Sequence, residues 1–324
     1  MQIKKIVFHT KNQGPGAFRF SEKHRYLIGR AAQGAELVFT DWDEARLMSE
    51  AGDCDVAVTQ NNRPPPPSFY EAAKNLCWVH CLMAGFDKMR VPDRKRILFT
   101  VTKGIHAVPL AEHTLALMLS AARSLHISRD NQRLKVWSRP TDVIELCGAT
   151  AGIVGFGEIG SAIAELLGKI GMRVIALSRS RPRADRSALA SEYYAPEQME
   201  DFLPQCDFVI IAAPLTDATE YLFCARLFAM MKPSAWLINI ARGAIVVEAD
   251  LVAALVSGRI AGACLDVAVS EPRPADDPLW ELPNAILTPH CANASPKKMD
   301  RITELFLENL RRYGRNEPLL YSEE

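Results

Sequence analysis

Short apolar runs rich in β-branched residues alternate with helical patterns along almost the whole of this 324-residue chain. Such alternation is typical of parallel β-sheets covered by helices. A domain usually has about 100 to 200 residues, so the length indicates two domains. The apolar fraction of 48% is that of a globular protein and excludes a disordered or collagen-like chain. We therefore expect an α/β fold with two parallel sheets.

The expected strands fall into two series. A helix that begins near Pro109 follows the first series, and a last helix, from Pro296 to about Tyr313, follows the second. We expect this last helix to return to the first domain, so that residues 1–103 and 291–324 form one domain and residues 104–290 the other. The first series is predicted at residues 4–8, 36–40, 55–59, 76–82 and 97–102, and the second at 151–155, 173–178, 208–212, 235–240, 262–266 and 285–287.

A glycine-rich turn stands directly after the first strand of the second series. Gly155, Gly157 and Gly160 form the pattern G-x-G-x-x-G, with Glu158 and Ile159 inside it, and a helical run follows. In this context the glycines permit a tight turn, close approach of the backbone to a pyrophosphate, and packing of the helix against the strand. Free N–H groups at the helix start would face the phosphates. The turn predicts that residues 104–290 form a dinucleotide-binding domain.

The end of the next strand indicates which dinucleotide is bound. An acidic residue at this place would accept a hydrogen bond from the ribose 2′-hydroxyl of NAD, but the chain has Ser178, Arg179, Ser180 and Arg181. No carboxylate repels a 2′-phosphate here, and two arginines can bind one. We predict that NADP(H) is preferred and that NAD(H) is the alternative. The simpler interpretation is that both arginines are only solvated.

Three ionisable side chains, Arg242, Glu271 and His290, follow predicted strands of the second series at their carboxyl ends. Sheets of this kind bind ligands at that edge, so the three would meet beside a nicotinamide. His290 would donate a proton to a carbonyl oxygen as hydride reaches the carbon, and Glu271 would orient the imidazole and stabilise its charged form. Arg242 would bind a substrate carboxylate and polarise the carbonyl. Taken singly, each of these three residues is as typical of a solvated loop without a catalytic role as it is of an active site.

Other groups of ionisable residues give weaker evidence of a functional site. Cys77, His80 and Cys81 lie close together, but strand alternation would place both cysteines on one face and the histidine on the other. No fourth ligand is near, so we predict no metal site. His106 and His113 are further ionisable residues, and His113 falls within a helical pattern that favours a structural role.

Charge and hydropathy exclude several classes of protein. The 38 basic and 38 acidic residues balance, which argues against a nucleic-acid partner, and we interpret the basic run at residues 88–103 as solvated surface. No stretch approaches the roughly 18 apolar residues of a membrane span, and the first residues lack the apolar run of a signal peptide. The eight scattered cysteines are then expected to stay reduced in a cytoplasmic protein.

Several short segments match a known family pattern. They are Ala84-Gly-Phe-Asp87, Leu110-Ala-Glu-His-Thr-Leu-Ala-Leu117, Gly155-Phe-Gly-Glu-Ile-Gly160, Ala213-Pro-Leu-Thr216, Asn239-Ile-Ala-Arg-Gly243, Leu265-Asp-Val267, Glu271-Pro272 and Thr288-Pro-His290. On these segments the chain, from about residue 50 to its end, resembles the D-isomer-specific 2-hydroxyacid dehydrogenase family, which includes glyoxylate/hydroxypyruvate reductases. The resemblance implies a flavodoxin-like substrate domain and a Rossmann cofactor domain, both doubly wound, and a homodimer.

The same resemblance implies roles for particular residues. It supports the roles given above for the arginine, the glutamate and the histidine. It implies that the substrate carboxylate is received by the backbone around Ala84 and Gly85 and that residues 1–103 with 291–324 form the substrate domain. It also implies that the cofactor is contacted by Asp266, at its nicotinamide carboxamide, and by Pro214, Thr219 and Ala241.

The chain departs from the family pattern at several positions. Met83 stands where a glycine is frequent, so Met83 and Phe86 either favour a small or apolar substrate side chain or point into the core. Ser178 replaces an aspartate that is common in NAD-using members. Cys291, next to His290, is either a packed thiol or a cause of oxidant sensitivity.

We therefore predict an oxidoreductase that reduces a small 2-oxoacid of the glyoxylate or hydroxypyruvate kind to the D-2-hydroxyacid with NADPH. One alternative is an NAD-preferring D-2-hydroxyacid dehydrogenase. The other is a non-catalytic dinucleotide-sensing protein, like the transcriptional corepressors that share this fold.

Overall fold

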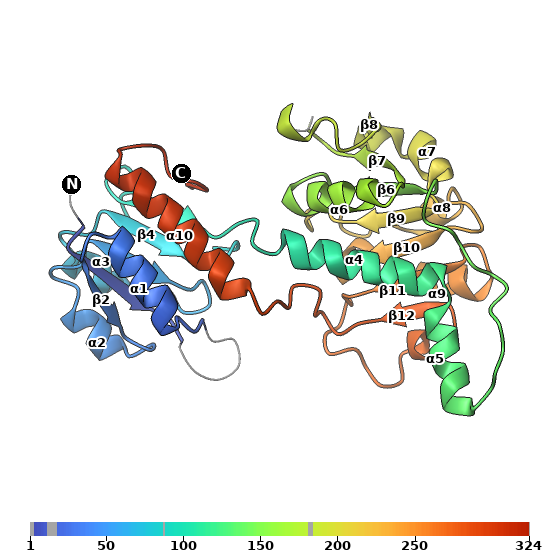
Figure 1. The fold of residues 1–324 in the computed structure, drawn as a ribbon, viewed down its shortest axis with the longest axis horizontal. Helices are drawn as coiled ribbons and strands as arrows, with labels where there is room; N and C mark the ends of the chain where they lie inside the picture. The colour runs from blue at the N-terminus through green and yellow to red at the C-terminus, as the bar shows by residue number, and fades with distance from the viewer. Residues whose placement is uncertain (1–2, 12–17, 87, 181–183, 324) are drawn as a thin grey trace. The chain divides into compact units, whose positions relative to one another are not determined.

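The computed structural model describes residues 3–11, 18–86, 88–180 and 184–323. The chain forms two compact units (Figure 1). Unit 1 comprises Met1–Ile105 and Ser295–Glu324, and unit 2 comprises His106–Ala294. The chain changes unit at residues 105–106 and 294–295, where the sequence analysis placed the changes at 103–104 and 290–291.

Unit 1 is built on a parallel sheet with the strand order β2-β1-β3-β4-β5, which is the flavodoxin-like order. Helices cover both faces, with α1 and α10 side by side on one of them (Figure 1). The elements are β1 Lys5–His9, α1 Glu22–Ala31, β2 Glu36–Phe39, α2 Glu44–Ser49, β3 Val56–Thr59, α3 Pro67–Ala72, β4 Trp78–Cys81, β5 Leu98–Val101 and α10 Lys298–Gly314.

Large apolar side chains fill both faces of this sheet. Trp78 stacks on Phe306 of α10 with 5.1 Å between ring centroids, and Phe8 of β1 joins the same cluster. Phe69 and Phe99 belong to the cluster on the other face. All of these rings are at most 2% exposed, so each contributes about 2 to 3 kcal/mol of apolar burial to unit 1.

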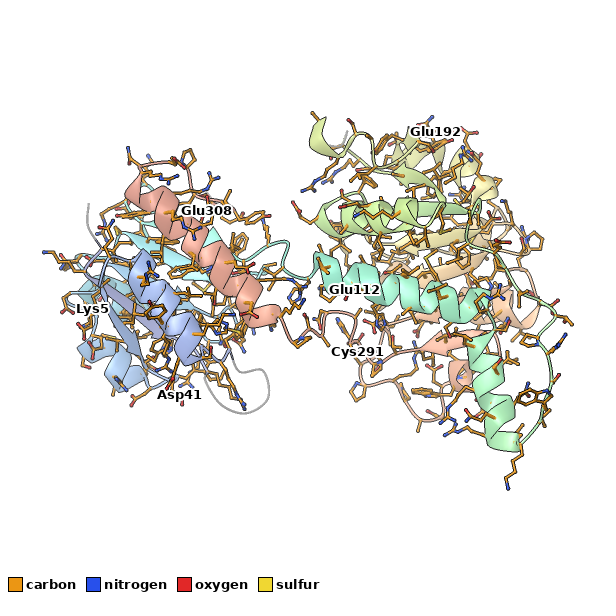
Figure 2. The ribbon with its side chains drawn as sticks, viewed as in Figure 1. Lys5, Asp41, Glu112, Glu192, Cys291 and Glu308 are labelled. Atoms are coloured by element: carbon orange, nitrogen blue, oxygen red, sulfur yellow. The ribbon has the colours of Figure 1, made fainter. Side chains whose placement is uncertain are left out.

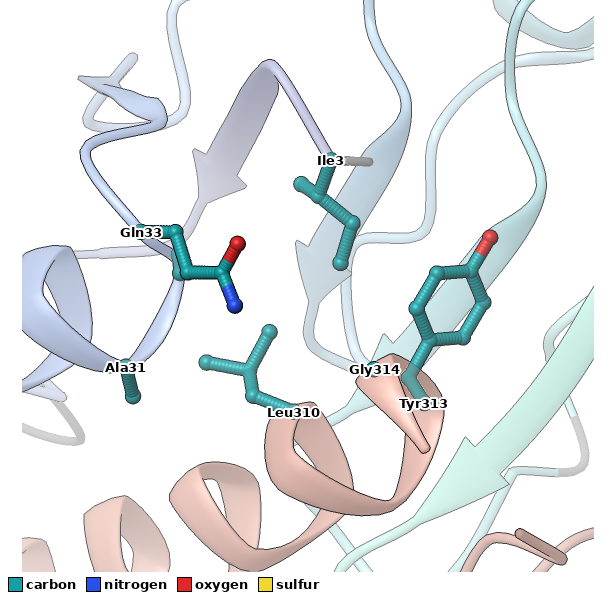
Figure 3. A pocket seen from close by; sticks show the side chains of 7 residues that line it. Ile3, Ala31, Gln33, Leu310, Tyr313 and Gly314 are labelled. Carbon is teal, nitrogen blue, oxygen red and sulfur yellow. The ribbon is translucent and has the colours of Figure 1, made fainter. Parts of the chain in front are cut away.

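Lys5 lies at the amino end of β1 (Figure 2). It forms ion pairs with Glu50, at 2.5 Å, and with Asp53, at 2.9 Å. A pocket of about 290 Å³ lies between the end of α1 and the end of α10, and Ile3, Gln33 and Leu310 line it (Figure 3). Its ionisable lining residue is Tyr313, whose hydroxyl donates to Cys77 Sγ at 3.1 Å. This pocket therefore offers a ligand no free charge from its lining residues.

Unit 2 is built on a parallel sheet with the strand order β12-β11-β10-β9-β6-β7-β8, which contains the Rossmann order. Helices α4 and α6 pack on one face, and α7, α8 and α9 on the other. The elements are α4 Ala107–Ala122, α5 Leu125–Leu134, β6 Thr150–Val154, α6 Glu158–Lys169, β7 Arg173–Leu177, β8 Glu192–Tyr194, α7 Met199–Phe202, β9 Phe208–Ile211, α8 Ala225–Phe228, β10 Trp236–Asn239, α9 Glu248–Val256, β11 Gly262–Leu265 and β12 Ala285–Leu287. Short 3-10 helices lie at Ala184–Arg186, Pro196–Gln198, Leu203–Gln205, Gly243–Ile245 and Pro278–Trp280.

The predicted fold class of two doubly wound parallel-sheet domains is confirmed, and two elements were not predicted. The second sheet has a further edge strand, β8, which is only three residues long and not fully buried. Helix α5 was not predicted either, and it buries none of its residues.

Within the residues that the structure describes, no helix is both long and apolar enough to cross a membrane. The eight cysteines are all free thiols, and none is paired in a disulfide.

Candidate active site

Three neighbouring strands bring the predicted catalytic residues to one edge of the unit 2 sheet. Arg242 follows β10, Glu271 follows β11 and His290 follows β12. Because the three strands are parallel, their carboxyl ends lie at the same edge. The topology thus gathers into one region side chains that are up to 48 residues apart in the chain.

The imidazole of His290 contacts the carboxylate of Glu271. His290 Nδ1 lies 2.7 Å from Glu271 Oε2, and the backbone N–H of Ala268 donates to Glu271 Oε1 at 2.9 Å. Burial opposes ionisation of Glu271, but the Ala268 N–H, the contact with His290 and the positive charge of Arg242 together lower the pKa of this carboxyl. The glutamate is therefore an anion that can hold the imidazole in place by Nδ1 and leave Nε2 free to act on a substrate.

The loop that carries Arg242 is fixed by a buried amide and a glycine. Asn239 Nδ2 donates to the carbonyl of Arg242 at 2.9 Å, and the N–H of Ala241 donates to Asn239 Oδ1 at 3.1 Å. A Cβ atom at Gly243 would lie 2.0 Å from the carbonyl carbon of Ala268. Only glycine permits this approach, so the arginine loop lies directly against the loop that leads to the glutamate.

The backbone at His290 is held in a left-handed conformation, with φ of 49°. The His290 N–H donates to the carbonyl oxygen of Asp266 at 2.7 Å. The Asp266 side chain is 1% exposed and accepts from the Thr288 hydroxyl at 2.6 Å and from the N–H groups of Cys291 and Ala292, both at 3.0 Å. Asp266 thus anchors the chain on both sides of the histidine.

A pocket of about 560 Å³ opens beside these groups, entirely within unit 2. Its lining combines Asp266, Glu271 and His290 with the apolar side chains of Leu287 and Trp280. Apolar walls with a few converging polar groups are typical of a small-molecule site.

The glycine turn has the geometry of a phosphate-binding loop. Gly155 has φ of 97°, and a Cβ atom there would lie 2.5 Å from the backbone of Ala213. A Cβ atom at Gly160 would lie 2.2 Å from the Gly155 carbonyl oxygen, whereas one at Gly157 would project into open space. Gly157 is also the residue that precedes α6, so a ligand can approach its backbone and meet the first N–H groups of that helix.

Ser178 lies beside this turn. The strand register pairs Val154 with Leu177, and the Gly155 N–H donates to the carbonyl of Leu177 at 2.9 Å. Arg179 and Ser180 follow and are exposed. Arg181, the second predicted phosphate ligand, lies outside the described residues.

The remaining predicted cofactor contacts lie on loops of the same unit. Thr219 donates from its hydroxyl to the carbonyl of Pro214 at 2.7 Å and so closes the loop after β9. Ala241 lies between β10 and the arginine. Glu158 pairs with Arg186 at 2.7 Å, and Ile159 packs on the core.

The predicted substrate residues belong to unit 1. Ala84 and Gly85 are exposed on the loop that follows β4, at the carboxyl edge of the sheet. Met83 packs against both core clusters of the unit, and the Phe86 ring lies edge-to-face on Phe99 at 5.5 Å. These contacts favour the interpretation that Met83 and Phe86 are core residues. Asp87, the last residue of this motif, lies outside the described residues.

The group at Cys77, His80 and Cys81 is structural. His80 is fully buried and contacts the hydroxyls of Thr100, at 2.7 Å, and Thr102, at 3.1 Å. The expected face assignment was wrong for Cys77: this residue precedes β4 and packs with the cluster that contains α10, whereas Cys81 packs on the opposite face.

Sequence reasoning missed several supporting residues because their partners are distant in the chain. Asn239, Gly243 and Ala268 position the arginine and the glutamate. Asn239 and Gly243 lie in a segment that matches the family pattern, but no role was assigned to them, and Ala268 lies in none of the matching segments. The prediction that His113 is structural fits its position on α4, where Nε2 lies 3.1 Å from the hydroxyl of Thr288. His106 precedes the same helix.

Burial and the charge of Asp266 raise the pKa of the Cys291 thiol, which favours a packed thiol over an oxidant-sensitive thiolate.

The chain is similar to known proteins over most of its length. Residues 115–292 match the family described as "D-isomer specific 2-hydroxyacid dehydrogenase, NAD binding domain". The chain is 35% identical to the glyoxylate reductase of Pyrococcus furiosus over 303 residues, which cover 87% of this chain and 88% of that protein. It is 30% identical to the hydroxypyruvate reductase of Blautia hydrogenotrophica, with 86% and 88% covered.

The fold is also similar to solved structures. A D-isomer specific 2-hydroxyacid dehydrogenase from Xanthobacter autotrophicus Py2, in complex with NADPH and MES, matches with a TM-score of 0.77 and 27% identity, covering 99% of this chain and 98% of that one.

Proposed function

Because the chain belongs to the D-isomer specific 2-hydroxyacid dehydrogenase family, whose members are NAD(P)-dependent oxidoreductases, we propose that it reduces a small 2-oxoacid to the D-2-hydroxyacid with NADPH. The substrate class is that of glyoxylate and hydroxypyruvate, on which the relatives act by name. The observation that carries the proposal is the 2.7 Å contact between His290 Nδ1 and Glu271 at the edge where the glycine turn also lies.

The residues of the glycine turn fit a dinucleotide. The open space beside Gly157, together with the free N–H groups at the start of α6, accommodates a pyrophosphate. Ser178, Arg179, Ser180 and Arg181 would hold the adenosine ribose and its 2′-phosphate, and Asp266 the nicotinamide carboxamide. When bound, the nicotinamide cofactor supplies the hydride that reduces the carbonyl carbon.

The protein's own groups bind, orient and protonate. Arg242 holds the substrate carboxylate and draws electron density from the carbonyl oxygen. The imidazolium of His290 donates its Nε2 proton to that oxygen, while the Glu271 anion keeps Nδ1 engaged and stabilises the charged ring. After reduction, His290 is neutral and takes a proton from solvent before the next cycle.

Unit 1 would supply the rest of the substrate site. Its residues, predicted as 1–103 with 291–324, would form the substrate domain, with the exposed backbone at Ala84 and Gly85 receiving the carboxylate. Residues 104–290 would form the cofactor domain.

The proposed preference for NADPH rests on the sequence Ser178 to Arg181 and on the exposed position of Arg179 beside the glycine turn.

The decisive experiment is a panel of 2-oxoacids, including glyoxylate and hydroxypyruvate, assayed with NADPH and with NADH in parallel. We expect oxoacid-dependent oxidation of NADPH with a higher kcat/KM than that of NADH, and a product of D configuration by chiral chromatography where the product has a stereocentre. Cofactor binding without turnover on any oxoacid would instead indicate a dinucleotide-sensing protein.

We also propose that the protein is a cytoplasmic homodimer. Helix α5 buries none of its residues, and the segment that includes it exposes Leu134, Val136 and Trp137, the last completely. An apolar surface of this kind is best covered by a second copy of the chain. Sedimentation should give a dimer for the wild type, and Trp137→Asp should shift the population toward the monomer.

A further inference from the structure

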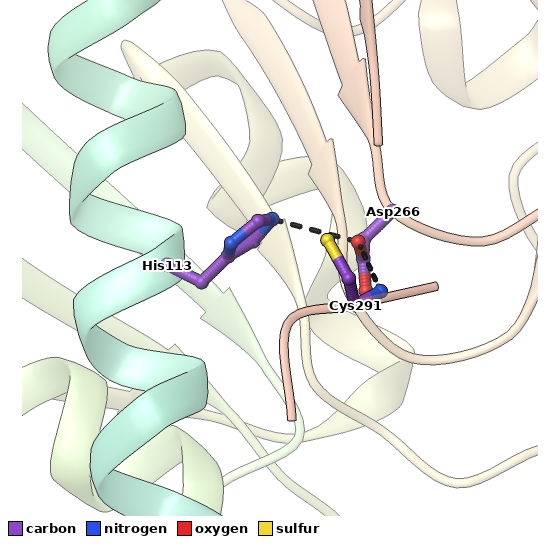
Figure 4. Close-up of side chains that lie close together, drawn as sticks. All are labelled: His113, Asp266 and Cys291. Atoms are coloured by element: carbon purple, nitrogen blue, oxygen red, sulfur yellow. Dashed lines mark hydrogen bonds and ion pairs between the residues drawn. The ribbon is translucent and has the colours of Figure 1, made fainter. Parts of the chain in front are cut away.

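A second group of ionisable side chains lies next to the candidate active site and has no role in the proton transfer. It consists of His113 on α4, Asp266 after β11 and Cys291 after β12 (Figure 4). One ligand atom from each side chain lies within 4.8 Å of the other two. Cys291 lies on the segment that follows β12 (Figure 2).

The three side chains form the donor set that zinc prefers. Imidazole nitrogen, carboxylate oxygen and thiolate sulfur bind Zn²⁺ at about 2.0 to 2.3 Å, so two ligands of one ion lie about 3.3 to 3.8 Å apart. His113 Nε2 and Asp266 Oδ1 are already 3.5 Å apart. Cys291 is partly exposed and His113 half-buried, so side-chain rotation can bring the sulfur and the nitrogen closer.

The charge of Asp266 gives an independent reason for a cation at this place. The side chain is 1% exposed, and His113 is the one basic side chain within ion-pair distance of it in the part of the chain that the structure describes. Buried carboxylates are normally paired with a cation or bound to a metal. Four neutral donors approach Asp266: the Thr288 hydroxyl, the N–H groups of Cys291 and Ala292, and the Cys291 thiol. The thiol is the donor that a metal ion would replace, because it would lose its proton and bind the ion as thiolate.

We propose that His113, Asp266 and Cys291 bind Zn²⁺ or a similar thiophilic divalent cation, and that the bound ion inhibits the reductase. As the Zn–S bond forms, the Cys291 thiol gives its proton to solvent. The Thr288 hydroxyl donates to Asp266, so His113 Nε2–H is the donor in its contact with that hydroxyl. On metal binding Nε2 gives this proton to solvent while Nδ1 takes one from solvent, and the neutral ring binds the ion through Nε2. Three protein ligands leave the fourth tetrahedral position to water.

Inhibition follows from the position of the site and rests on the proposed function. Asp266 is the residue proposed to contact the nicotinamide carboxamide, and its backbone carbonyl and carboxylate anchor the residues on both sides of His290. An ion that recruits the Asp266 carboxylate therefore competes with the cofactor and displaces the proton donor. NADPH should in turn weaken metal binding.

Metal binding is measured on the full-length protein without cofactor, using Co²⁺ as the probe. The wild type should take up one Co²⁺ per chain and show a thiolate-to-cobalt charge-transfer band in the near ultraviolet, and Zn²⁺ should abolish the band stoichiometrically. Cys291→Ala should lose the band, and both Cys291→Ala and His113→Asn should bind zinc about tenfold or more weakly in competition with a chromophoric chelator.

Two variants serve as matched controls. Cys147 is an exposed thiol of the same unit, and His126 is a half-buried histidine. Cys147→Ala and His126→Asn should retain the wild-type band and affinity. A band that survives Cys291→Ala, or the absence of a 1:1 complex, would overturn the site whether or not the protein is a reductase.

Inhibition is measured separately. Zn²⁺ should inhibit NADPH-dependent oxoacid reduction reversibly, with recovery on addition of EDTA, and Cys291→Ala should need about tenfold more zinc. If the wild type binds zinc at this site and its activity is unchanged, the inhibitory part of the proposal is wrong.

Discussion

The two sheets of the molecule have the same architecture but use their histidines in opposite ways. In unit 1, His80 lies inside β4, fully buried, with both ring nitrogens next to threonine hydroxyls. In unit 2, His290 lies just beyond β12, is exposed, and contacts a carboxylate. One imidazole is neutral and inaccessible, and the other is accessible and held by an anion.

The difference shows that a doubly wound sheet does not determine chemistry by itself. Side chains within the strands build the core, and those a few residues beyond the strand ends build the site. A histidine in the first position contributes to stability and one in the second to catalysis. Substitutions at these two kinds of position should therefore separate loss of activity from loss of stability.

The largest effect is expected from His290→Ala. Loss of the proton donor should lower kcat for oxoacid reduction by about 10² to 10⁴-fold, and the urea midpoint should change little, because the side chain is exposed. Steady-state kinetics and equilibrium unfolding on the same preparation test this. A large loss of stability with unchanged kcat would reverse the proposed contrast with His80.

The second-largest effect expected is a loss of stability of unit 1 at acid pH. Burial lowers the pKa of His80 from 6.5 to about 3, so the ring stays neutral in the fold but is protonated in the unfolded chain below pH 6.5. The free energy of unfolding should therefore fall as the pH decreases from 6.5 toward 3, by about 2 to 3 kcal/mol from His80 alone between pH 6.5 and 4.5. His9, with its pKa lowered to about 4 mainly by burial, adds to the same trend.

Urea unfolding at a series of pH values measures this dependence. His80→Gln keeps hydrogen-bonding groups near both threonines and should flatten the curve between pH 6.5 and 4.5. His126→Gln, a change at a partly exposed histidine of unit 2, should leave it as in the wild type. Equal slopes in all three proteins would refute the role of the buried ring.

Arg242→Lys should lower kcat/KM for the oxoacid by about 20-fold or more, because a lysine ammonium cannot bind a carboxylate through two parallel hydrogen bonds. The KM for NADPH should stay within about twofold, since the arginine is proposed to contact the substrate only. A change confined to the cofactor KM would show that the substrate role is wrong.

Ser178→Asp should shift the ratio of kcat/KM for NADPH over NADH by about tenfold toward NADH, because the new carboxylate repels a 2′-phosphate and accepts from a 2′-hydroxyl. Ser257→Asp adds the same charge at an exposed position after α9 and should leave the ratio unchanged. An unchanged ratio in Ser178→Asp would contradict the proposed basis of NADP preference.

The smallest effect is expected from Glu271→Gln. The glutamine can still contact Nδ1 of His290, but it replaces the carboxylate whose pKa is lowered in part by the imidazole contact, so the alkaline limb of the kcat profile for reduction should move to lower pH. The comparison of interest is between pH profiles, not rates at one pH. A superimposable profile would mean that the 2.7 Å contact orients the ring without stabilising its charge.

The sequence predicted those elements whose signals are local. All eleven expected strands lie within one or two residues of the observed ones, because short apolar runs rich in β-branched residues differ clearly from helical patterns. The glycine turn was predictable because each glycine has a steric reason that is visible in the order of the residues.

Features that depend on partners distant in the chain could not be predicted. Strand β8 is short and half-exposed, so its pairing with β7 supplies most of its stability. The contact of Gly243 with Ala268 joins two loops that the chain alone does not relate. The grouping of His113, Asp266 and Cys291 likewise depends on the packing of α4 beside β11.

The left-handed backbone of His290 has a consequence for how this chain can change. Glycine would adopt φ of 49° without steric cost, whereas histidine keeps it at a cost of about 1 to 2 kcal/mol. The most stable residue at position 290 is therefore not the one proposed to donate the proton. Selection for thermal stability alone would remove the imidazole, and a stability-optimised variant of this protein should be expected to lose its chemistry at this residue first.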